Sequence, residues 1–82
     1  MKLLKFEAAW CGPCKELSRV MSVMKDLPEI QVINIDENAE LVKQYQIRAG
    51  PTLVLLDDND NVLDKRTGMC STDALREFVS GK

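Results

Sequence analysis

Two cysteines, separated only by Gly12 and Pro13, stand where the hydrophobic pattern of the chain changes its period. Before them, residues 2–8 alternate between two faces, which is typical of a strand. After them, apolar side chains recur every three or four residues, as on one face of a helix: Leu17, Val20, Met21 and Met24. Pro13 suits a first helical turn, where its missing N–H costs nothing, and Pro28 marks the expected exit. The pattern therefore predicts Cys11 and Cys14 where a strand leads into a helix.

The rest of the chain predicts three more strands and two more helices. Strands are expected at 30–36, 52–56 and 61–67, the last two joined by the polar turn 57–60. A short helix follows Asn38, which we expect to cap it, and a final helix is capped by Ser71 or Thr72. The order β-α-β-α-β-β-α predicts an α/β fold, in which a four-stranded mixed sheet carries helices on both faces. We find no repeat or linker and expect one domain over residues 1–82.

Composition excludes several classes of protein. The chain has 82 residues, of which 45% are hydrophobic and 29% charged, and a net charge of −2, so it has no basic field for nucleic acid or an anionic membrane. No apolar run approaches the roughly 20 residues of a membrane helix. Charged residues interrupt the N-terminal apolar stretch, so we expect no signal peptide and a cytoplasmic location. With three cysteines and no histidine, the chain lacks the usual disulfide framework and the commonest general base.

The cysteine pair predicts redox chemistry. One helical turn brings the two sulfurs within reach of a disulfide, while the helix N-terminus favours a thiolate. We expect Cys11 to be the more exposed and to attack a target disulfide, Cys14 to resolve the mixed disulfide, and Trp10 to shield one side. A metal site and a purely structural pair remain as alternatives. Zinc normally takes four ligands, and this chain offers only three cysteines and no histidine.

Two segments of the chain resemble the thioredoxin family. Residues 10–15, Trp-Cys-Gly-Pro-Cys-Lys, are similar to its active-site motif, and residues 45–52, Tyr-Gln-Ile-Arg-Ala-Gly-Pro-Thr, to its second signature. Residues 34–36 and Gly68 also fall where the family has matching residues. The resemblance implies a dithiol–disulfide oxidoreductase without a cofactor or metal of its own. It would act on protein disulfides and be reduced again by an NADPH-dependent thioredoxin reductase.

The resemblance also implies the site. Cys11 and Cys14 would be catalytic, and the substrate would be bound by Trp10, Gly12, Pro13, Gly50, Pro51 and Gly68. Pro51 would follow a cis peptide bond against the disulfide, and Gly50 would offer backbone hydrogen bonds to an extended substrate. A trans Pro51 that merely opens a strand is the alternative.

The chain departs from the family at several points. It begins at what looks like the second strand, so a leading β-α unit is missing, and we expect one sheet face to be less covered. Gly50 stands where the family usually has an aliphatic residue, which predicts a more open groove. Lys5 stands where thioredoxins usually carry a buried acid. We expect a solvated Lys5–Glu7 pair; the alternative places Lys5 beneath the disulfide, where its charge favours the Cys14 thiolate.

Cys70 is expected to be a partly buried small residue, with a regulatory or dimer-forming thiol as the alternative. The favoured interpretation of the whole chain is a small, monomeric, glutaredoxin-sized thioredoxin. A glutaredoxin-like enzyme acting on glutathione mixed disulfides and a non-catalytic binding subunit are the other two candidates.

Overall fold

Four strands and three helices follow one another along residues 1–80, the part of the chain that the computed structural model describes. They are β1 (Lys2–Glu7), α1 (Gly12–Ser22), β2 (Glu29–Asn34), α2 (Ala39–Gln44), β3 (Thr52–Leu56), β4 (Val62–Thr67) and α3 (Thr72–Val79). This is the predicted order of elements. None of the helices in this part of the chain combines the length and apolar character that a membrane crossing requires.

The four strands form one mixed sheet in the order β2-β1-β3-β4. β1 pairs with β2 in parallel, with Lys5 opposite Val32, and α1 provides the crossover that such a pair needs. β1 and β4 both pair with β3 in antiparallel register. The predicted four-stranded mixed sheet is confirmed.

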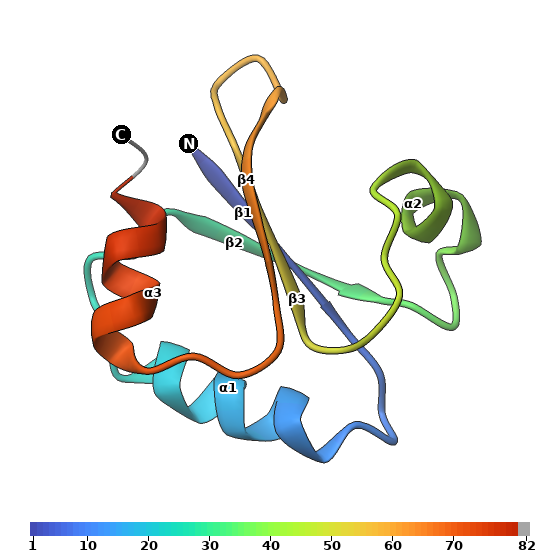
Figure 1. The fold of residues 1–82 in the computed structure, drawn as a ribbon, viewed down its shortest axis with the longest axis horizontal. Coiled ribbons are helices and arrows are strands. Elements are labelled where there is room, and N and C mark those ends of the chain that lie inside the picture. The colour runs from blue at the N-terminus through green and yellow to red at the C-terminus, as the bar shows by residue number, and fades with distance from the viewer. Residues whose placement is uncertain (81–82) are drawn as a thin grey trace.

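Helices cover both faces of this sheet (Figure 1). α1 and α3 pack on one face, over a core that includes Leu3, Leu17, Leu55 and Leu75. α2 lies on the other face, over a second core around Phe6. All five residues of β3 are buried, which is the burial expected of a strand covered on both sides. The expectation of a less covered face is therefore wrong for the centre of the sheet, but four of the six β2 residues are exposed, Val32 among them.

Some helix boundaries differ from the prediction. α1 ends at Ser22 and not near Pro28, although Met24 still packs against the core from the turn that follows. Asn38 precedes α2, but its side chain makes no capping hydrogen bond and donates to the Asn34 carbonyl instead. Ser71 caps α3 as predicted, since its hydroxyl accepts a hydrogen bond from the Ala74 N–H.

Candidate active site

Cys11 and Cys14 form a disulfide at the start of α1. Their Cα atoms are 5.3 Å apart, a normal spacing for a disulfide across one turn. Cys11 is the N-cap residue, and its sulfur accepts a hydrogen bond of 3.1 Å from the Cys14 N–H. An N–H that points at this sulfur would also stabilise a thiolate there after reduction. The pair is therefore built to exchange between dithiol and disulfide.

Both cysteines are buried in the disulfide form. Cys11 is 4% exposed and Cys14 2%, and the two pack with Ala8 and the partly buried Ile35. The expectation that Cys11 would be clearly the more exposed is not met in this form. Gly12 and Pro13, which lie between the cysteines, are exposed. The turn between the two cysteines therefore faces solvent, while the cysteines themselves are covered.

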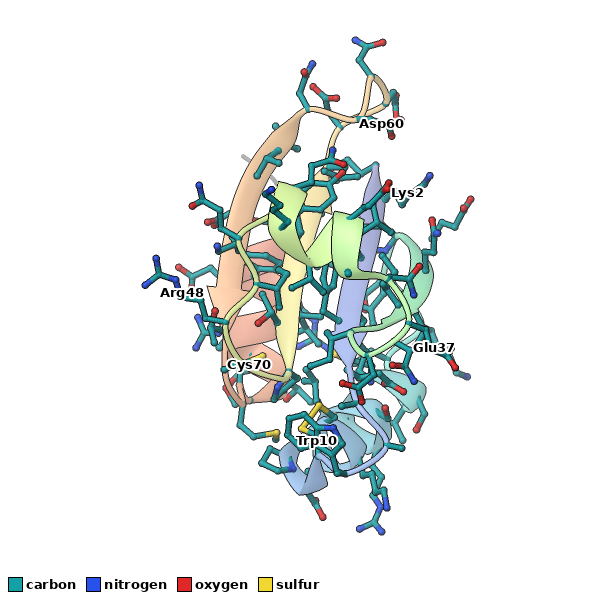
Figure 2. All side chains as sticks on the ribbon, turned by 90° about the vertical axis from the view of Figure 1, so that its right-hand side faces the viewer. Lys2, Trp10, Glu37, Arg48, Asp60 and Cys70 are labelled. Carbon is teal, nitrogen blue, oxygen red and sulfur yellow. A yellow bond between two sulfur atoms is a disulfide. The ribbon has the colours of Figure 1, made fainter. Side chains whose placement is uncertain are left out.

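Trp10 is the exposed aromatic side chain beside the disulfide. It is 70% exposed and lies at the same end of the molecule as the two sulfurs (Figure 2). Its indole N–H donates a hydrogen bond of 3.0 Å to the carboxylate of Asp36, which follows β2. Sequence reasoning did not assign this role to Asp36, because nothing local links residues 26 positions apart. The bond orients the indole while leaving most of its surface free for contact.

The loop before β3 lies directly against the disulfide. The Gly50–Pro51 peptide bond is cis, so the predicted isomer is confirmed and the trans alternative is wrong. A Cβ added to Gly50 would lie 3.0 Å from the Cys14 sulfur and 3.4 Å from the Cys11 sulfur. The glycine therefore brings its backbone into contact with the sulfurs. The more open groove that the sequence predicts at Gly50 stays a prediction.

Gly68 connects this loop to the segment after β4. Its N–H donates a hydrogen bond of 2.8 Å to the carbonyl of the buried Pro51. Its φ of 96° lies in the region that only glycine adopts readily. Gly68 is thus joined to the loop that lies against the cysteine pair, and its role in substrate binding stays a prediction.

Lys5 is buried, which corrects the expectation of a solvated pair. Its side chain is 3% exposed, and it forms the predicted ion pair with Glu7, whose side chain is 33% exposed. The Lys5 Nζ also donates a hydrogen bond of 2.6 Å to the hydroxyl of Ser18, a contact that sequence reasoning missed. Ser18 on α1 contacts the ammonium group, and little of the Lys5 side chain is left exposed.

Cys70 is a buried free thiol, 7% exposed, in the core between α1, α3 and the sheet. This position confirms the expectation of a buried small residue. Among residues 1–80, no cluster of three or more histidine, cysteine or acidic side chains is arranged to hold a metal ion.

A redox-active cysteine pair at the N-terminus of a helix, beside a cis proline and on a mixed α/β sheet, defines a thiol–disulfide exchange protein. The family profile for thioredoxin matches residues 1–81. The chain therefore belongs to the thioredoxin family and is a thiol–disulfide oxidoreductase.

Individual relatives agree with this assignment. The chain is 37% identical to a thioredoxin of Bacillus subtilis over 82 residues, covering 95% of this chain and 78% of the relative. It is 33% identical to a thioredoxin of Chlamydia trachomatis over 81 residues, again covering 95% of this chain and 78% of the relative.

Solved structures show the same likeness. A mutant form of the thioredoxin of Halobacterium salinarum superposes with a TM-score of 0.86 at 33% identity, covering 96% of this chain and 71% of that one. The thioredoxin of Fasciola hepatica superposes with a TM-score of 0.81 at 30% identity, covering 96% and 77%. The glutaredoxin-like and binding-subunit alternatives are not favoured by these comparisons.

Proposed function

We propose that Cys11 is the nucleophile and Cys14 the resolving thiol in the reduction of protein disulfides. The Cys11 thiolate attacks one sulfur of the substrate disulfide, and a mixed disulfide forms while the other substrate sulfur leaves and takes up a proton. The Cys14 thiolate then attacks the Cys11 sulfur, and the second substrate sulfur leaves in the same way. The substrate gains two electrons and two protons, and the dithiol becomes the Cys11–Cys14 disulfide. The observation that carries this assignment is the hydrogen bond of 3.1 Å from the Cys14 N–H to the Cys11 sulfur.

The substrate is an extended protein segment that lies across the exposed rim of the site. Trp10, Gly12 and Pro13 form one side of this rim, and Gly50 and Gly68 form the other, with Pro51 buried beside them. The backbone of Gly50, which carries no side chain, is available to pair with an extended chain in the manner of an added strand. The 70% exposure of Trp10 supports a contact role, because a large aromatic side chain gains most from being covered by a partner.

An electron donor must restore the dithiol after each turnover. We assign this role to an NADPH-dependent thioredoxin reductase, which the family resemblance implies. We further propose that the protein acts as a monomer in the cytoplasm, a reducing compartment in which a cysteine pair of this kind cycles and a lone buried thiol such as Cys70 stays reduced.

Trapping experiments test the order of attack. A Cys14→Ser variant should accumulate a mixed disulfide with a disulfide-containing test protein, because the resolving thiol is gone. A Cys11→Ser variant should accumulate far less, since the Cys14 N–H that favours a thiolate points at the Cys11 sulfur. Cys70→Ser serves as the matched control and should turn over normally. The proposal is wrong if the adduct forms through Cys14, or if the double variant Cys11→Ser, Cys14→Ser still reduces the test protein.

A further inference from the structure

Lys5 is the one charged residue that is buried among residues 1–80. A charged amine in this position is costly unless it is paired and hydrogen-bonded. Both conditions are met here, because the Lys5 Nζ contacts the Glu7 carboxylate and donates to the Ser18 hydroxyl at 2.6 Å. The thiol–disulfide exchange of Cys11 and Cys14 does not use the Lys5 ammonium group directly. A buried charge that takes no direct part in the reaction can still influence it through its electric field.

The contacts of Lys5 lead directly to the turn that carries the resolving cysteine. The Ser18 hydroxyl, which accepts from Lys5, donates a hydrogen bond of 3.1 Å to the Cys14 carbonyl. Ser18 follows Cys14 by one helical turn, so the two side chains lie about 6 Å apart along the axis and on the same face of α1. None of these contacts involves a sulfur atom, so both redox forms can keep them.

We propose that Lys5 is a positioning residue whose charge, partly balanced by Glu7, favours the thiolate of Cys14 during resolution of the mixed disulfide. In this step the Cys14 thiolate forms the bond to the Cys11 sulfur, the bond from Cys11 to the substrate breaks, and the substrate sulfur leaves with the electron pair. A positive charge whose side chain is only 3% exposed stabilises a nearby attacking anion more strongly than one in water. The inference rests on the proposed roles of Cys11 and Cys14.

The other groups around Lys5 do not compete for this role. Its cross-strand neighbours, Val32 on β2 and Leu53 on β3, are apolar, and Glu7 faces Asn34. The remaining charged side chains of the two helices on this face are exposed: Lys15, Glu16 and Arg19 on α1, and Asp73, Arg76 and Glu77 on α3. Water screens those charges more strongly than it screens the Lys5–Glu7 pair.

Replacing Lys5 and replacing Glu7 should shift the titration midpoint of the Cys14 thiol in opposite directions. Lys5→Met removes the positive charge while keeping an unbranched side chain, so the titration midpoint of the Cys14 thiol should rise by about 0.5 to 1 unit. Glu7→Gln removes the balancing negative charge, so the same midpoint should fall. Lys43→Met is the matched control, because it removes an exposed lysine from α2, on the other face of the sheet.

The titration midpoint of the Cys14 thiol is measured in the reduced protein from the pH dependence of the Cys14 Cβ chemical shift. This measurement needs no substrate. The expected result is a rise in Lys5→Met, a fall in Glu7→Gln and no change in Lys43→Met. The proposal is overturned if Lys5→Met matches Lys43→Met. Where Lys5→Met does not fold, an unchanged or raised midpoint in Glu7→Gln overturns it. Failure of the trapping experiment would instead refute the order of attack, and the titration does not depend on it.

Discussion

Replacing Gly50 with alanine should destabilise the protein by pressing a methyl group onto the disulfide. The added Cβ would lie 3.0 Å from the Cys14 sulfur, well inside the roughly 3.5 to 4.0 Å of an ordinary contact. Neither side can move easily, because Pro51 is fully buried and held through its carbonyl by the Gly68 N–H, and Cys14 is fixed in α1. Overpacking of this kind costs about 1 to 3 kcal/mol.

Thermal and urea unfolding of the oxidised protein measure this cost. For a chain of this size, 1 kcal/mol corresponds to about 4 to 8 °C, so Tm should fall by roughly 4 to 24 °C. Gly12→Ala is the matched control, since its added Cβ meets no atom within 4 Å. That variant should be as stable as the parent, or more stable by up to about 1 kcal/mol, because Gly12 lies in α1. Equal stability of Gly50→Ala and Gly12→Ala would refute the argument.

Three further outcomes follow from the packing and the charges. Phe6→Ala removes a side chain with 0% exposure and should cost about 3 to 5 kcal/mol in urea unfolding, whereas a cost under about 1 kcal/mol would contradict the assigned core. Hydrogen bonds from the backbone N–H of Asn61 and, less strongly, of Asn59 hold the pKa of Asp57 below its ordinary 3.8. The stability that the Asp57 carboxylate contributes is therefore present above pH 3.8 and is lost as the pH falls through the lower pKa of the folded state. The loss of unfolding free energy in Asp57→Ala, relative to the parent protein, should therefore become smaller in acid. A loss that stays constant from neutral pH to pH 3 argues against this. Cys70 should react with a thiol reagent about tenfold or more slowly in the native than in the unfolded protein, and equal rates would show that it is accessible.

The order of elements was predictable because each segment carries its own signal. The change of period around Cys11, the polar turn at 57–60 and the serine before α3 are local features, and each lies where it was expected. The end of α1 was not predictable in this way. Met24 continues the helical spacing and packs against the core, yet it does so from a turn. The spacing of hydrophobic residues indicates which side chains are buried, but it does not determine whether the backbone at those residues is helix or turn.

The candidate active site was likewise predictable only in part from the sequence. The cysteine pair and Pro51 were predictable from short motifs, but the surroundings of Lys5 were not. Alternation along β1 shows only that Lys5 shares a face with Leu3, and whether that face is wet depends on how α1 lies across it. The contact between Lys5 and Ser18 spans 13 residues, and the one between Trp10 and Asp36 spans 26. Such contacts belong to the tertiary structure, and no local pattern encodes them.

The most direct test of the account is to find which sulfurs become oxidised when the fully reduced protein meets an equivalent of a disulfide-containing test protein. Free thiols are alkylated at the end of the reaction, and peptides are mapped by mass spectrometry. We expect a Cys11–Cys14 disulfide, two new thiols in the test protein for each such disulfide formed, and Cys70 alkylated as a free thiol. A test protein that stays oxidised, or a disulfide that includes Cys70, would contradict it.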